Sequence, residues 1–171
     1  VIELNGEGNN AYNDANYVLI IDTGGNDTYA QGAGTSVTSP VSILIDTKGN
    51  DSYESNGSSC FGAGILGFGC LVDGQGNDTY KAKTHSMGVG AFGAGILLDL
   101  NGNDTYTIRQ IGQGAGVCGV GLLSDVSGTD AYHCFQMAQG YASTKGFGAL
   151  VDNRGNDNYV GNDEKIEYPS A

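Results

Sequence analysis

The sequence predicts an all-β fold, a parallel β-solenoid (β-helix) of about six coils with a period near 26 residues. Three observations lead to this prediction. A short motif recurs six times, many of the thirty glycines fall in register with it, and a branched aliphatic residue stands two positions before each copy. A fixed period of this kind is the signature of a solenoid, in which each coil buries its apolar side only against its neighbours.

The motif begins with aspartate and ends with tyrosine, and five of its six copies contain Gly-Asn-Asp. The copies cover residues 22–29, 46–53, 73–80, 99–106, 125–132 and 152–159. Their glycines are 24 to 27 residues apart, which suits one coil of a parallel β-solenoid or a leucine-rich repeat. No part of the repeat has the apolar period of a helix, so the leucine-rich repeat is excluded.

Each coil is predicted to contain a turn at the motif, a strand through its tyrosine, a bend, and glycine-spaced strands that end in aliphatic residues. The aliphatic column predicts a stacked inner wall and consists of Ile20, Leu44, Leu71, Leu97, Leu123 and Leu150. Glycine columns, such as Gly69, Gly95, Gly121 and Gly148, indicate close approach of backbones, either across a thin interior or between packed outer faces. We expect the tyrosines to stack inside the coil or at its corner; the alternative is an exposed aromatic row that grips sugars.

The motif runs through almost all of the 171 residues, so we expect a single β-solenoid domain over 1–171. Residues 1–17 are predicted to form an irregular N-terminal segment or a partial coil, in which Asn5 and Asn10 replace the two aspartates of the motif. Residues 160–171 are predicted to form a C-terminal tail. No stretch approaches the roughly 20 apolar residues that cross a bilayer. The sequence begins at Val1, as we expect of a processed protein whose targeting segment has been removed.

The formal net charge is −12, and the two aspartates in each of six motifs supply twelve negative charges. Lysine and arginine are few and scattered, which argues against nucleic acid as a partner, because binding to nucleic acid needs a basic surface.

The four cysteines, Cys60, Cys70, Cys118 and Cys134, show no Cys-x-x-Cys spacing, so a zinc site is not expected. Free thiols and disulfides, with Cys60–Cys70 and Cys118–Cys134 as the closest pairs in sequence, both remain open.

The motif aspartates form two columns of like charge, since stacked strands lie about 4.8 Å apart. Each contact between neighbouring aspartates of a column costs on the order of 1 kcal/mol in water and about 3 kcal/mol near a protein surface. Six aspartates make five such contacts in each column, so the two columns together cost roughly 10–30 kcal/mol. That exceeds the roughly 5–15 kcal/mol by which a domain is stable. A bound cation is therefore expected, and several Ca²⁺ ions fit best, because calcium takes six to eight oxygen ligands in flexible geometry. The predicted ligands are Asp22, Asp27, Asp46, Asp51, Asp73, Asp78, Asp99, Asp104, Asp125, Asp130, Asp152 and Asp157.

The segment Gly74-Gln-Gly-Asn-Asp-Thr-Tyr80 resembles the calcium-binding nonapeptide of RTX repeat proteins, and all six copies keep its Gly-x-Asp-x-Tyr part. The resemblance implies a secreted parallel β-roll that folds on meeting extracellular calcium and holds ions between successive turns. It implies a ligand role for the second aspartate of each motif: Asp27, Asp51, Asp78, Asp104, Asp130 and Asp157. The role of the first aspartates, Asp22 to Asp152, follows from the charge argument alone.

We expect an extracellular or cell-surface structural protein without enzymatic activity, a surface or filament-forming subunit that associates end to end, because neither end shows a capping helix or a charge cluster. The alternative is a polysaccharide-active enzyme or its calcium-dependent carbohydrate-binding module. Catalytic carboxylate pairs are singular, whereas these pairs recur in every coil. His85 and His133 occupy different positions in their coils, which disfavours a catalytic triad.

Overall fold

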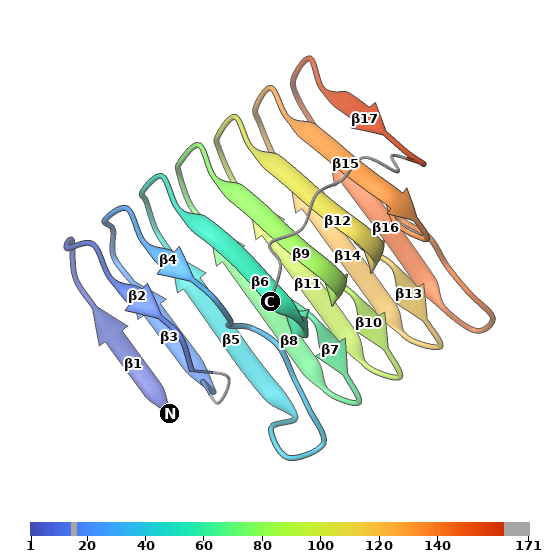
Figure 1. Ribbon diagram of the computed structural model, residues 1–171, viewed down its shortest axis with the longest axis horizontal. Coiled ribbons are helices and arrows are strands. Elements are labelled where there is room, and N and C mark those ends of the chain that lie inside the picture. The colour runs from blue at the N-terminus through green and yellow to red at the C-terminus, as the bar shows by residue number, and fades with distance from the viewer. Residues whose placement is uncertain (15–16, 163–171) are drawn as a thin grey trace.

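The chain folds as a parallel β-solenoid, and the described residues contain no helix (Figure 1). The computed structural model describes residues 1–14 and 17–162. Leu71, Leu97 and Leu123 are partners in adjacent strands and lie 26 residues apart. The predicted fold class and period are therefore confirmed.

Three parallel sheets make up the solenoid, and each coil contributes one strand to each large sheet. Sheet A contains, in spatial order, β1 (Ile2–Asn5), β3 (Leu19–Asp22), β5 (Val41–Asp46), β8 (Phe68–Asp73), β11 (Ala94–Asp99), β14 (Val120–Asp125) and β16 (Phe147–Asp152). Sheet B contains β2 (Ala11–Tyr12), β4 (Thr28–Tyr29), β6 (Ser52–Cys60), β9 (Thr79–Ser86), β12 (Thr105–Gly112), β15 (Ala131–Gln136) and β17 (Asn158–Val160). The small sheet C contains β7 (Gly64–Ile65), β10 (Gly90–Ala91) and β13 (Gly116–Val117).

Sheets A and B lie face to face as two layers, with the motif turns along one edge (Figure 1). A coil runs along sheet A, crosses at the motif turn into sheet B, and returns to sheet A, in the middle coils through sheet C. Each strand of sheet A therefore delivers its last residue, an aspartate in every strand from β3 on, to the same edge.

The interior is filled by two stacked columns. The aliphatic residues from Ile20 to Leu123 are fully buried, as the sequence predicts, and Leu150 of the last coil packs against them partly buried. Seven tyrosine rings, those of Tyr12, Tyr29, Tyr53, Tyr80, Tyr106, Tyr132 and Tyr159, stack with centroids 4.6–4.8 Å apart. All but Tyr159, at the end of the stack, are buried, so the tyrosines pack inside the coil and do not form an exposed sugar-binding row.

The glycine column of Gly69, Gly95, Gly121 and Gly148 faces the interior, which answers for this column the question that the sequence leaves open. A Cβ atom added to Gly95 would lie 1.9 Å from the carbonyl oxygen of Val89, and one added to Gly121 would lie 2.1 Å from that of Ala115. Contacts this short leave no room for a side chain. The two backbone layers therefore approach each other closely at the end of the coil that lies away from the motif turns.

Residues near the N-terminus form a partial coil, in which β1 pairs with β3 and β2 pairs with β4. The predicted tail over 160–171 falls outside the described residues from position 163 on.

All four cysteines are free thiols, with Cys60 and Cys134 buried, so neither disulfide is present. Within the part of the chain that is described, no helix has the length and apolar character to span a membrane.

Candidate metal centre

The two aspartate columns lie inside the solenoid, along the edge where the chain crosses from sheet A to sheet B. The first aspartate of each motif is the last residue of a sheet A strand, and the second stands immediately before a sheet B strand. From Asp22 to Asp130, every one of these side chains is at most 3 % exposed, whereas Asp152 and Asp157 in the last coil are half-buried. Burying so many carboxylates requires compensation for each charge.

The second aspartates are joined from coil to coil by hydrogen bonds. The backbone N–H of Asp51 donates to Oδ1 of Asp78 over 2.6 Å, and that of Asp78 donates to Oδ1 of Asp104 over 2.6 Å. The same bond recurs from Asn10 to Asp157 at 2.6–3.0 Å. The glycine of the motif leaves room for the carboxylate of the second aspartate. A Cβ atom on Gly76 would lie only 2.5 Å from both carboxylate oxygens of Asp78.

The other oxygen, Oδ2, of each second aspartate is buried without a hydrogen-bond partner in five coils. These aspartates are Asp27, Asp51, Asp78, Asp104 and Asp130. Asp73 and Asp99 from the first column each add an unpartnered Oδ1. Buried polar atoms nearly always have partners, so an unpartnered oxygen repeated in register points to a missing positive group.

The first aspartates receive hydrogen bonds from the tyrosine stack. The hydroxyl of Tyr80 lies 2.8 Å from Oδ2 of Asp99 and 3.1 Å from Oδ2 of Asp73, and the hydroxyl of Tyr106 makes the same kind of contact to Asp99 and Asp125. Burial and the nearby carboxylates hold the pKa values of Tyr80 and Tyr106 well above the usual value. The phenols therefore stay protonated and act as donors.

Some first aspartates also cap the motif turn. Oδ1 of Asp46 accepts the backbone N–H of Lys48 over 3.1 Å, and Oδ1 of Asp125 accepts that of Ser127 over 3.1 Å. Turn capping of this kind is ordinary for Asp and Asn. It accounts for one oxygen of these residues but leaves the unpartnered oxygens of Asp73 and Asp99 without an explanation.

Eleven of the twelve predicted ligands come together in five groups of three. In each group, one carboxylate oxygen from each aspartate lies within 4.8 Å of the other two. The groups are Asp27, Asp46 and Asp51; Asp51, Asp73 and Asp78; Asp78, Asp99 and Asp104; Asp104, Asp125 and Asp130; and Asp130, Asp152 and Asp157. In the second and third groups all three aspartates carry an unpartnered buried oxygen.

Asp22 is the one predicted ligand that joins none of these groups. In the coil before it, Asn10 stands where the other coils have the second aspartate, and its side chain donates to Oδ2 of Asp22 over 3.1 Å. The hydroxyl of Tyr12 donates to the same oxygen. An amide thus replaces the third carboxylate, and the ladder of acidic groups begins one coil later.

Burial and mutual repulsion raise the pKa values of the grouped carboxyls. Desolvation raises the pKa of Asp78 to about 9, and the charge of Asp73 adds to it. The pKa of Asp104 is raised to about 8 by desolvation and by Asp99, and desolvation raises the pKa of Asp51 to about 8. At neutral pH these carboxyls therefore need either a proton or a cation.

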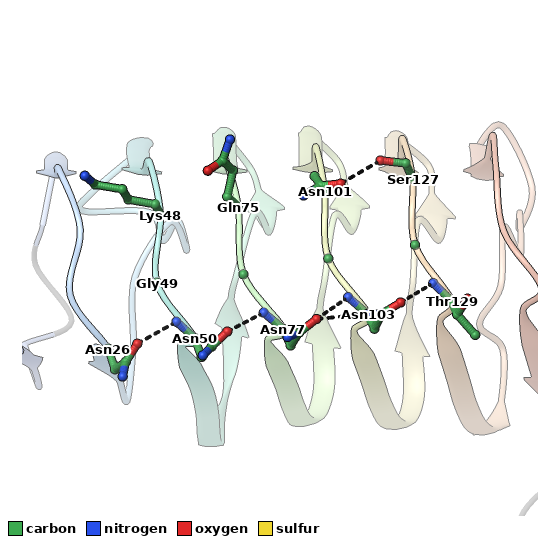
Figure 2. Close-up of a pocket in the computed structure, with 13 residues that line it drawn as sticks. Asn26, Lys48, Gly49, Asn50, Gln75, Asn77, Asn101, Asn103, Ser127 and Thr129 are labelled. Carbon is green, nitrogen blue, oxygen red and sulfur yellow. Dashed lines mark hydrogen bonds between the residues drawn. The ribbon is translucent and has the colours of Figure 1, made fainter.

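An exposed polar groove runs along the outside of the same turns (Figure 2). Its volume is about 630 Å³, and a column of side chains lines it: Asn26, Asn50, Asn77, Asn103 and Thr129. Oδ1 of Asn26 accepts the backbone N–H of Asn50 over 2.8 Å, and the bond repeats to Thr129. The asparagines thus tie each turn to the next one and present polar atoms to solvent.

Sequence reasoning missed two sets of residues around the aspartates. The sequence predicts the tyrosines as packing groups, whereas in the structure their hydroxyls contact the first aspartates. The signal for this role is tyrosine, never phenylalanine, in all six motifs. The sequence places the motif asparagines only in a turn, although they form a ladder.

Comparison of the chain with protein-family models, with curated proteins and with solved structures gave no match.

Proposed function

We propose that this protein is a calcium-binding structural β-solenoid that holds a row of Ca²⁺ ions along its motif edge. The observation that carries the proposal is the set of buried, unpartnered carboxylate oxygens that recurs with the coil. Each coil brings two aspartates, so its formal charge of −2 matches one divalent cation. A cation in each group would supply the partner that these oxygens lack.

Calcium suits these groups better than other common metals. All ligands offered by the groups are carboxylate oxygens, and calcium accepts such ligands in flexible geometry. Magnesium usually keeps several waters, which the buried groups disfavour. The groups contain neither histidine nor cysteine, which zinc and copper would prefer.

Equilibrium dialysis with metal analysis tests the proposal. We expect about five Ca²⁺ ions per chain, one for each group. Asp78→Asn changes a residue shared by two groups, and we expect it to remove one or two ions while distant coils keep theirs. Glu54→Gln removes one exposed negative charge from the outer face of sheet B and serves as the control. Absence of bound calcium from the folded wild type, or equal loss in both variants, would refute the proposal.

An extracellular or cell-surface role is proposed from the RTX-like motif, since calcium there is abundant enough to keep such sites loaded. We also propose that chains associate end to end. The first and last strands of sheet A, β1 and β16, have no further partner among the described strands. Unpaired strand edges favour such pairing. Negative-stain microscopy with calcium would show filaments, and strictly single particles would count against this part of the proposal.

The exposed asparagine groove favours a second candidate, a polysaccharide-binding module. Amide side chains at a regular spacing suit the hydroxyl and carboxyl groups of a polymer lying along the turns. We propose no catalysis there, because the same groups recur in every coil. Binding of uronate-containing polysaccharides, measured with and without calcium, distinguishes this module from a pure scaffold.

A further inference from the structure

The strands of sheet A carry apolar side chains on the outer face as well as along the inner aliphatic wall, which is unusual for a sheet that borders solvent. The outward positions, which alternate in burial with the inner wall, are Ile2, Leu4, Leu19, Ile21, Val41, Ile43, Ile45, Phe68, Cys70, Val72, Ala94, Ile96, Leu98, Val120, Leu122, Ser124, Phe147, Ala149 and Val151. Ser124 is the single polar residue among them, and none is charged. Near-continuous apolar runs such as Ile96-Leu97-Leu98 are typical of parallel strands covered on both sides.

The outer face of sheet B provides the contrast within the same molecule. Its outward positions carry polar and charged side chains, including Glu54, Lys81, Lys83, Thr107 and Arg109. One large sheet therefore has a surface suited to water, and the other does not.

The apolar face has the extent of a protein interface. Seven strands lie about 4.8 Å apart, two of them four residues long and five of them six residues long, and at about 3.3 Å per residue they cover on the order of 600 Å². Soluble monomers rarely expose a larger contiguous apolar patch than this. Two such faces in contact would bury about 1,200 Å² in total, at the lower limit for specific protein–protein interfaces.

We infer that the outer face of sheet A binds the same face of a second copy of this chain, as a two-fold symmetric dimer. A broad face formed by a regular sheet can pack on itself, as the two sheets of a β-sandwich do at about 10 Å. In a two-fold symmetric dimer the same surface patch of each chain contacts that patch of the other chain. The net charge of −12 disfavours an anionic membrane as the occupant, and the uncharged face is where two such acidic chains can meet with the least repulsion.

The dimer is independent of the metal centre and of end-to-end association. The aspartates lie along the motif edge, the chain ends lie at the two ends of the stack, and Ile96 lies mid-sheet, between Cys70 and Leu122 of the neighbouring strands. Substitution of Ile96 therefore leaves both other features unchanged.

Sedimentation equilibrium of the calcium-loaded protein over a wide concentration range tests the inference. We expect a wild-type dimer, and Ile96→Lys raises the dissociation constant by about tenfold or more, since the two-fold axis buries the new charge twice. Thr107→Lys, at a half-buried outward position on sheet B, is the matched control and stays dimeric. A wild type that is monomeric throughout, or equal behaviour of the two variants, overturns the inference.

Two further measurements keep the inference testable if Ile96→Lys fails to fold. In the unmodified protein, the thiol of Cys70 lies on the apolar face and that of Cys118 at the turn that follows sheet C, and both are half-buried. We expect Cys70, and not Cys118, to lose reactivity toward a maleimide as the protein concentration rises; equal reactivity at all concentrations contradicts the dimer. Binding to phosphatidylcholine vesicles by a protein that is monomeric in solution would assign the face to lipid instead.

Discussion

Removal of the bound cations is expected to unfold the solenoid at pH 9 and to leave it folded at pH 5. The perturbation is to strip the protein with EGTA and then dialyse it into metal-free buffer at each pH. Metal binding is coupled to folding when the ligands repel one another in its absence. The outcome then depends on whether protons can replace the lost cations.

The size of the effect follows from the group of Asp78, Asp99 and Asp104. Its three carboxylate oxygens lie within 4.8 Å of one another, so each ionised pair costs about 3.5 kcal/mol at an effective dielectric constant of about 20. Three pairs cost about 10 kcal/mol, which is comparable to the roughly 5–15 kcal/mol of stability of a whole domain. One fully ionised, metal-free group is enough to threaten the fold.

The sign of the pH dependence comes from the raised pKa values. The pKa of Asp78 lies near 9 and that of Asp104 near 8 in the folded chain, against 3.8 for a free carboxyl. The folded chain therefore holds more protons than the unfolded chain between about pH 4 and 9. The stability that these protons confer is complete below about pH 4 and is lost as the pH rises through 8 and 9.

Circular dichroism with thermal melting checks this expectation in four conditions, stripped and calcium-loaded at each pH. We expect the loaded protein to melt at a high temperature at pH 9 and the stripped protein to lose its β-spectrum there. The reasoning is falsified if the stripped protein at pH 9 keeps the spectrum and the melting temperature of the loaded protein.

Three substitutions test the interior of the coil, each by chemical denaturation. Tyr80→Phe removes a buried hydroxyl that contacts two carboxylates and is expected to cost about 1.5–3 kcal/mol, whereas Tyr159→Phe at the exposed end costs less; equal losses would contradict the role of burial. Gly95→Ala places a Cβ atom 1.9 Å from a backbone carbonyl of the opposite layer and is expected to destabilise by about 3 kcal/mol or more, while Gly57→Ala, whose nearest atom is 3.4 Å away, is nearly neutral. Leu97→Ala opens a cavity in the aliphatic column and is expected to cost about 2–5 kcal/mol; a loss below 1 kcal/mol would mean that the column is loosely packed.

The fold could be predicted from the sequence because every coil repeats the same side chains. The position of Leu97 in its column, the turn at each motif and the two aspartate columns along one edge all follow from a fixed period. The acidic groups follow too, since a period of one coil places second aspartates of adjacent coils beside each other. The sequence predicts Asp22 as a ligand like the others, whereas in the structure Asn10 of the partial coil takes the place of the third carboxylate beside it.

Other features could not be predicted from residue types. His85, near the end of β9, and Met87, directly after β9, have φ values of 50° and 60°, and such side chains give no sequence signal for a left-handed backbone. The sequence predicts a bend between the tyrosine strand and the glycine-spaced strands, but not the division of that layer into sheets B and C. The direction of the glycine columns depends on how closely two layers approach, which only the three-dimensional arrangement shows.

The side-chain ladders at the motif turn have a consequence for how such a protein can change in length. Oδ1 of Asp78 accepts a bond from the coil before it, and Oδ1 of Asn77 accepts one from the coil after it. The ladder partners lie 24–27 residues apart from Asn26 to Asp157. Duplication or deletion of one 26-residue unit in the gene would therefore preserve the partners of every remaining coil, and evolution can lengthen or shorten the molecule one coil and one acidic group at a time.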